Sequence, residues 1–227
     1  MKTSKREYLK KPEFHQDSDV NFWPGFIDVF VSILMVFILI AFIRLILNTE
    51  ALEMLEIKSS QEQFGKIFRK KFEKEIKEKK IKLVSLGNLQ QITFSSEILF
   101  TSGSADLSVD GKRLLKRLVF IFEEARQKSR FKQIQVEGHT DNVPISNSLR
   151  EIFASNWELS SQRAINVVQY FIAFIESGKV KSLKSSLFSG TGYAYHKSVA
   201  SNKTEEGRAL NRRIEIRLVY FTDFGKS

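Results

Sequence analysis

The strongest pattern in the chain is an apolar run near its amino terminus. From Phe26 to Ile43 only Asp28 and Ser32 are polar, and beyond Arg44 the apolar character continues to Leu47. About 20 apolar residues make a helix long enough to cross the hydrocarbon core of a bilayer. The pattern therefore predicts one transmembrane helix over residues 23–47, with a basic tail at residues 1–22.

Asp28 is the only ionisable side chain in the first part of this run. A carboxylate within the hydrocarbon is expensive and usually functional. Ser32 lies about one helical turn further along the same face, so both groups can meet a common ion or partner. Alternatively, an interfacial Asp28 stabilises the helix amino terminus, where the dipole favours negative charge. The pattern alone leaves both interpretations open.

The charges on the two sides of the run predict its orientation. Basic residues precede it, whereas Glu50, Glu53 and Glu56 follow it. The positive-inside rule then puts the amino terminus in the cytoplasm and most of the chain outside. A cleaved signal peptide is the alternative, but the apolar run is too long and no small-x-small cleavage site follows.

Residues 48–85 have a different character, dense in charge and amphipathic. Four apolar side chains recur every fourth residue: Phe64, Phe68, Phe72 and Ile76. This spacing predicts a helical linker that could lie on the membrane, pair as a coiled coil or plug an ion path. Nine Lys or Arg residues and three Glu between residues 66 and 82 supply most of the chain's net charge of +10. A solvated helix explains such a run, with attraction to anionic headgroups or cell-wall polymer as the alternative.

The remaining chain predicts a folded domain over residues 86–222, followed by a tail at residues 223–227. Alternating patterns indicate strands at residues 90–95, 131–137, 186–189 and 213–220. Helical spacing indicates helices at residues 108–125 and 156–175, with a short one near residues 204–210, and Ser108 is a candidate cap. The expected class is α+β, an α/β sandwich in which helices pack on one face of a mixed sheet.

Composition narrows the chemistry of this domain. There is no cysteine, and the three histidines do not show the spacing of a metal motif. We therefore expect no metal site and no resident cofactor. His139 and Asp141 do not form a catalytic triad without a placed serine, so an enzyme is the least supported class. An outside location also argues against nucleic-acid binding.

Four sequence blocks, in a fixed order along the chain, resemble a known domain family, which hydrophobic periodicity alone cannot identify. They are Gly138–Pro144, Ser155–Ala164, Gly190–Tyr193 and Asn202–Ile216. Together they resemble the peptidoglycan-binding OmpA/MotB domain, and residues 98–107 resemble the opening strand and loop of that domain. The segment Phe22–Asp28 resembles the Trp-then-Asp signature of MotB-type ion-motor subunits.

The resemblance implies a set of site residues. Asp28, with Ser32, would carry the ion. Asp141 and Arg163 would bind peptidoglycan, because an aspartate can hold the ammonium and an arginine the carboxylate of a diaminopimelate side chain. The other peptidoglycan-binding candidates are Thr140, Asn156 and Leu159, which would line the pocket, and Arg212 and Arg213, either of which could reach the peptide. The alternative is that Asp141 and Arg163 simply pair with each other.

The resemblance also implies a function and partners. The chain would be the B subunit of an ion-driven motor in the bacterial inner membrane, a homodimer anchored to peptidoglycan inside a pentameric ring of a multi-span MotA-like or ZorA-like A subunit. The load would be flagellar rotation or a Zorya-type anti-phage defence. The expected ion is H+, but Phe26 and Ile27 replace the usual Tyr and small residue, so Na+ stays open. A passive anchor between inner membrane and cell wall is the alternative.

Overall fold

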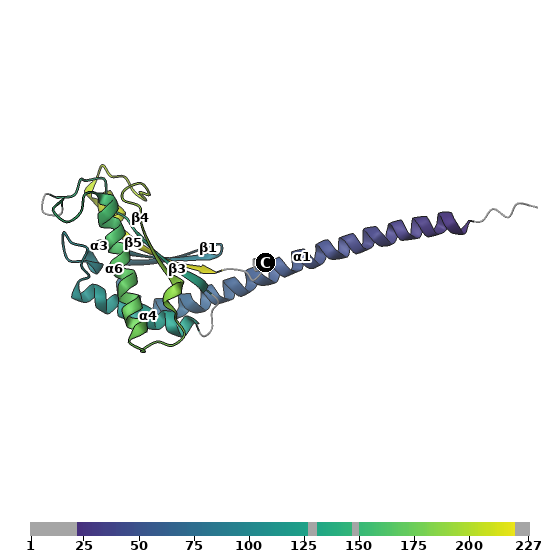
Figure 1. The fold of residues 1–227 in the computed structure, drawn as a ribbon, viewed down its shortest axis with the longest axis horizontal. Coiled ribbons are helices and arrows are strands. Elements are labelled where there is room, and N and C mark those ends of the chain that lie inside the picture. Colours follow the sequence, from purple (N-terminus) through teal and green to yellow (C-terminus); the bar gives the residue numbers. More distant parts are fainter. Residues whose placement is uncertain (1–21, 127–130, 147–149, 221–227) are drawn as a thin grey trace, which may run out of the picture. The chain divides into compact units, whose positions relative to one another are not determined.

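The computed structural model of the chain describes residues 22–126, 131–146 and 150–220 (Figure 1). The tails expected at residues 1–22 and 223–227 lie outside the described residues, apart from Phe22. The chain divides into two compact units, Met1–Thr49 and Glu50–Ser227. Each unit is described by itself below.

The first unit holds the apolar part of helix α1, whose bounds are Trp23–Lys71. Within the described residues, this is the one helix long and apolar enough to cross a membrane. None of the side chains at positions 23–48 is buried by the chain itself. Such a surface is stable only in contact with an apolar medium or with other helices.

The second unit is built on one mixed sheet of five strands in the order β1-β2-β5-β3-β4. The strands are β1 (Ile81–Leu86), β2 (Leu89–Ser95), β3 (Phe131–Gly138), β4 (Phe188–Gly192) and β5 (Arg213–Tyr220). β3 and β4 are parallel, and the other neighbours are antiparallel. The long connection between β3 and β4 contains α6 (Asn156–Glu176), which packs on both strands, as parallel pairing requires.

The other helices of this unit are α2 (Glu73–Lys77), α3 (Ser96–Leu99), α4 (Val109–Arg126) and α7 (Glu205–Asn211), and a 3-10 turn, η1, spans Ser185–Leu187. Ser108 caps α4 as expected, because its Oγ accepts a hydrogen bond of 2.9 Å from Gly111 N. α4 packs against α6 (Figure 1). The predicted α+β fold, a mixed sheet combined with helices, is confirmed.

Strand β5 shows how the sheet separates its two faces. Ile214, Ile216 and Leu218 are fully buried in the main hydrophobic core together with α4 and α6. Arg213 and Glu215 alternate with them and therefore point to the opposite face. That face carries a cluster of buried charges, described below.

The amphipathic segment differs from its predicted role as a linker. Phe64, Phe68 and Phe72 have no exposed surface and belong to the core of the second unit. Phe64 stacks on Phe122 of α4 with ring centroids 6.2 Å apart. The second unit thus begins at Glu50 and β1 begins at residue 81, both before the boundary expected at residue 86. The periodic apolar face packs on the domain's own core, so this face is not available for a coiled coil.

Two local predictions were also imprecise. The strand expected at residues 186–189 is the turn η1 followed by β4. The expected opening strand within residues 98–107 is the end of α3 and one isolated bridge between Phe100 and Leu107. Both segments are too short for periodicity to distinguish a strand from a single helical turn.

Candidate functional site

Four separate parts of the second unit meet around one cavity of about 560 Å³. They are Gly103 in the loop between α3 and α4, the loop after β3, the first turns of α6, and the helix α7 with Arg212. Six of the predicted peptidoglycan-binding residues line it: Thr140, Asp141, Asn156, Leu159, Arg163 and Arg212. The fold therefore brings together residues that belong to three of the four sequence blocks.

Close packing of α6 against the sheet positions these residues. A Cβ atom on Gly138 would lie 2.0 Å from the Ser160 carbonyl oxygen, and one on Gly192 would lie 2.3 Å from Ser161 Oγ. Only glycine permits this approach of strand and helix backbones. Because Gly138 ends β3 and Ser160 lies in α6, the same contact brings the loop that carries Asp141 close to the helix that carries Arg163.

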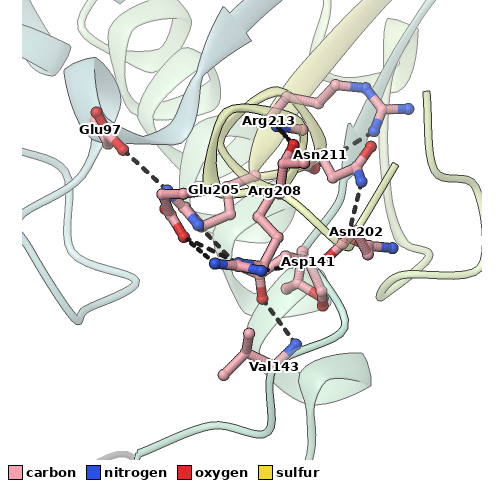
Figure 2. A network of polar contacts seen from close by, with 12 residues as sticks. Glu97, Asp141, Val143, Asn202, Glu205, Arg208, Asn211 and Arg213 are labelled. Carbon is pink, nitrogen blue, oxygen red and sulfur yellow. Dashed lines mark hydrogen bonds and ion pairs between the residues drawn. The ribbon is translucent and has the colours of Figure 1, made fainter. Parts of the chain in front are cut away.

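Asp141 is held from two sides. Its Oδ2 accepts a bond of 2.7 Å from Arg212 Nη1, and its Oδ1 accepts one of 3.0 Å from the backbone N–H of Val143 (Figure 2). Arg212 also pairs with Glu205 at 2.7 Å and with Glu97 at 3.3 Å. Although partial burial lowers the pKa of Arg212, these carboxylates raise it overall. Arg212 is thus a fixed cation that orients Asp141.

Arg163 is held by a different group. Its Nε and Nη2 donate to the Ser104 carbonyl at 3.0 and 2.9 Å, and its guanidinium lies over the Phe100 ring at 5.1 Å. Burial and the nearby Arg212 lower the pKa of Arg163 to about 10, which leaves it charged near neutral pH. Five N–H donors are available on a guanidinium, so three are left for a ligand. In the described residues Asp141 pairs with Arg212, and the direct Asp141–Arg163 pair does not form.

The remaining predicted residues shape the wall of the cavity. Asn156 Nδ2 donates to the Val143 carbonyl at 2.9 Å, which ties α6 to the loop after β3. Leu159 packs with Ala105 and Ile145 in a small apolar cluster separate from the main core. One side of the cavity is therefore apolar, and the other carries the charged groups.

Arg213 does not line this cavity. It lies on the charged face of the sheet, where its Nε donates to Glu215 Oε1 at 2.6 Å and its Nη2 to the Lys197 carbonyl at 3.0 Å. Of the two candidate arginines, the structure thus brings only Arg212 to the site. Sequence reasoning missed Glu205 and Arg208, which also line the cavity. Their spacing of three residues on a short helix was the available signal.

A second polar cluster lies on the charged face. Glu137 of β3 and Glu215 of β5 are directly opposite each other, and Arg217 contacts both carboxylates at 3.0 and 3.1 Å. The His139 imidazole is buried, with Nε2 3.8 and 3.9 Å from the two glutamates. Burial, together with Arg213, lowers the pKa of His139 to about 4, so this histidine is neutral at physiological pH.

The ligand-type atoms of Glu137, His139 and Glu215 lie within 4.8 Å of one another, an arrangement that local spacing did not reveal because Glu215 is on another strand. A divalent cation there would face Arg213 and Arg217, which already neutralise both carboxylates. We therefore interpret the cluster as a buried ion-pair network between β3 and β5, in which Glu137 Oε2 and both His139 ring nitrogens have no hydrogen-bond partner among the described residues. The absence of a metal site stays a prediction.

In the first unit, Asp28 and Ser32 are close in space as the helical spacing predicted. The Ser32 hydroxyl donates to the backbone carbonyl of Asp28 at 2.7 Å, the local bond common for serine within helices. The Asp28 carboxylate makes no ion pair with the described residues. The acid is thus presented outward from the helix.

Comparison with known proteins adds to this geometry. The sequence profile of the OmpA family matches residues 99–212. Motility protein B of Bacillus subtilis is 38% identical over 166 residues, which cover 70% of this chain and 57% of that protein. Among solved structures, a Desulfovibrio vulgaris protein described as MotB-like has a TM-score of 0.62 at 28% identity, covering 76% of this chain and 99% of that one.

A second solved structure is the cell wall anchor of the T6SS from Pseudomonas aeruginosa. It has a TM-score of 0.54 at 31% identity, and the match covers 67% of this chain and 96% of that one. The chain spans about half the length of the curated relatives it matches.

Proposed function

The chain belongs to the OmpA family, and from that premise we propose that its second unit binds peptidoglycan through the cavity between Asp141 and Arg163. The observation that supports this most strongly is that the predicted binding residues lie together in space. Six residues expected to contact the ligand come from separate segments and line one cavity. The cell wall anchor among the similar structures has the same kind of fold.

The charges of the cavity suit a ligand that carries both an ammonium and a carboxylate. Asp141 has four acceptor positions, of which Arg212 and Val143 occupy two, so an ammonium can still bind. Arg163 has unused N–H donors that can form a forked pair with a carboxylate. A diaminopimelate residue in a stem peptide presents both groups at one end, whereas Leu159 offers an apolar wall for its methylenes.

A pull-down with purified peptidoglycan tests this proposal. Full-length chain in detergent should co-sediment with peptidoglycan, and Asp141→Asn or Arg163→Gln should reduce the bound fraction at least tenfold. Asp110→Asn is the matched control, because Asp110 is an exposed carboxylate whose ion-pair partner among the described residues is Arg113 on α4. Equal binding by Asp141→Asn and the control would refute the proposed site.

For the whole chain we propose a B subunit of an ion-driven motor of the inner membrane. Similarity to motility protein B supports this, together with the apolar helix of the first unit, which carries Asp28 within its apolar stretch. Two chains would pair their helices inside a ring of a multi-span A subunit, with the amino termini cytoplasmic and the second units on peptidoglycan. Protonation of Asp28 would remove a charge that the low-dielectric surroundings disfavour.

The proton is the proposed ion, with Na+ as the alternative, and the load is flagellar rotation or an anti-phage defence motor. Each charge that crosses a potential of about 100 mV supplies about 2.3 kcal/mol. A passive anchor between membrane and wall is the second candidate, favoured by the similarity to the cell wall anchor. Co-purification separates the two, because only a motor subunit requires a multi-span partner that stays bound in detergent.

A further inference from the structure

Three aromatic rings stack on the surface of the second unit. Trp157 in the first turn of α6 stacks on His196 at 5.0 Å, and His196 stacks on Tyr195 at 4.4 Å, each pair with an interplanar angle of 24°. The side chains are exposed, Trp157 by 48% and Tyr195 by 43%. Large aromatic surface left in water is a common mark of an interaction site.

The backbone below this stack is well fixed. Ala194 adopts the left-handed conformation with φ of 47°, an unusual value for a residue other than glycine. Its N–H donates to Ser160 Oγ at 3.0 Å, and its carbonyl accepts from Thr140 N at 2.9 Å. Ser198 Oγ also donates to the Tyr195 carbonyl at 2.8 Å. The backbone that carries Tyr195 and His196 is thus fixed before any ligand binds, which reduces the entropic cost of binding.

The polar atoms of these rings are unused within the described residues. Trp157 Nε1, the His196 ring nitrogens and the Tyr195 hydroxyl make no hydrogen bond to the described part of the chain, although other polar atoms nearby do. The stack thus offers the faces of Trp157 and Tyr195 that are turned away from His196, together with ring edges, donors and acceptors. That combination suits a ligand with both C–H faces and hydroxyl or amide groups.

Residues next to the stack in the chain connect it to the proposed peptide cavity. Trp157 follows Asn156, which lines the cavity, and Tyr195 follows Ala194, whose carbonyl is bonded to the cavity residue Thr140. In peptidoglycan the stem peptide hangs from an amino sugar, and its third residue lies within about 10 Å of that sugar even when extended. A bound peptide therefore places the glycan strand next to the cavity, where this stack lies.

We propose that Trp157, His196 and Tyr195 form a platform that binds sugar rings of the peptidoglycan glycan strand. This inference rests on the proposed peptidoglycan binding and assigns the glycan contact to a surface separate from Asp141 and Arg163. The slightly positive C–H face of a pyranose complements the negative face of an aromatic ring, and the free ring donors can reach N-acetyl and hydroxyl groups.

Two defined fragments test the platform with the full-length chain in detergent. One is a disaccharide–tetrapeptide muropeptide, and the other is the free tetrapeptide, both titrated by calorimetry. The double substitution Trp157→Ala with Tyr195→Ala should weaken muropeptide binding about tenfold or more and leave the affinity for free tetrapeptide unchanged. Trp157→Phe with Tyr195→Phe, which keeps the rings, should restore most of the muropeptide affinity. Val109→Ala, at an exposed apolar position on α4, is the control.

The outcomes separate the two proposals. If the unaltered chain binds neither fragment, the proposed peptidoglycan site fails and the platform with it. If it binds both and the double alanine variant keeps full muropeptide affinity, only the platform is refuted. Equal losses for both fragments would also refute it, since the rings would then act on the peptide cavity. A wild-type dimer that the double alanine variant converts to monomer would assign the stack to a second copy of the chain instead.

Discussion

Arg212 and Asp141 form an ion pair of 2.7 Å at the edge of the cavity, which leaves Arg163 free of any carboxylate partner in the described residues. The two arginines thus have different roles, which the sequence alone did not distinguish. Arg212 orients the aspartate, whereas Arg163, fixed by the Ser104 carbonyl, keeps donors for the ligand. A site in which the two predicted groups paired with each other would have to break that pair before it could bind.

Substitution of Arg212 tests its orienting role. We expect Arg212→Gln to weaken peptidoglycan binding about tenfold, or about 1.4 kcal/mol, because Asp141 loses its fixed partner. The thermal midpoint of the second unit should also fall, because the buried Asp141 carboxylate loses its cationic partner. Sedimentation binding and a thermal melt measure the two effects. Arg113→Gln, which removes an exposed arginine on α4, should alter neither.

The sequence predicted most of the fold, because long elements carry strong periodic patterns. Helices α4 and α6 and strands β2, β3 and β5 appeared close to their observed bounds. Strand β1 was missed, since Ile81–Leu86 lies at the sheet edge and only Ile81 is buried. The sequence predicted the helix that carries Phe68, but it did not predict that this helix packs on the core of the second unit. Periodicity shows that one face of a helix is apolar, but it does not show which element covers that face.

The individual site residues could be predicted only from the four sequence blocks that resemble the OmpA/MotB domain. Thr140 and Asp141 lie in one block and Asn156, Leu159 and Arg163 in the next, so the resemblance named them together. The choice between Arg212 and Arg213 required the end of α7 and the register of β5, because Arg212 closes the helix and Arg213 begins the strand on its charged face. The cluster of Glu137, His139 and Glu215 depends on the same register and was invisible for that reason.

The packing of Phe68 gives a direct test of where the folded unit begins. We expect Phe68→Ala to destabilise the second unit by about 3–5 kcal/mol, the usual cost of removing a buried phenylalanine. Leu55→Ala on the same helix should cost little, because Leu55 is exposed. Urea unfolding of full-length chain in detergent compares the two. Equal effects would restore the interpretation of this segment as a separate linker.

The contact between Gly138 and α6 predicts a difference between two glycines on adjacent strands. Gly138→Ala should prevent normal folding, because its Cβ would meet backbone at 2.0 Å, where no side chain can move away. Gly190→Ala on β4 should be tolerated, since its nearest atom would be a Val168 methyl at 3.4 Å. Soluble yield and protease resistance report the outcome. A well-folded Gly138→Ala variant would contradict the close approach.

His139 predicts a dependence of stability on pH. Its pKa falls from 6.5 in the unfolded chain to about 4 in the fold, mainly through burial. The unfolded state therefore takes up a proton first as pH drops, and stability is lost progressively between about pH 6.5 and pH 4. The difference between these two pKa values corresponds to about 3 kcal/mol of stability at most.

His139→Gln removes this titration while keeping a polar side chain of similar size. The difference in unfolding free energy between wild type and variant should shrink or reverse as pH falls from 7 to 4. Glu137, whose pKa burial raises, works in the opposite direction but is present in both proteins and cancels. Denaturant titrations at each pH measure the difference. A gap that stays constant over this range would show that His139 does not titrate as proposed.

Asp28 offers the decisive test of the motor against the passive anchor. In the assembled complex, Asp28→Asn should abolish ion flux and work output while assembly and peptidoglycan binding persist, since the amide cannot cycle a proton. Ser32→Ala should reduce flux only partly, because the Ser32 hydroxyl donates to the Asp28 backbone carbonyl and not to the carboxylate. Ion flux into vesicles with a defined pH gradient measures the effects of both substitutions. Asp110→Asn is the control for an exposed carboxylate. Normal work output from an assembled Asp28→Asn complex would leave the chain as an anchor.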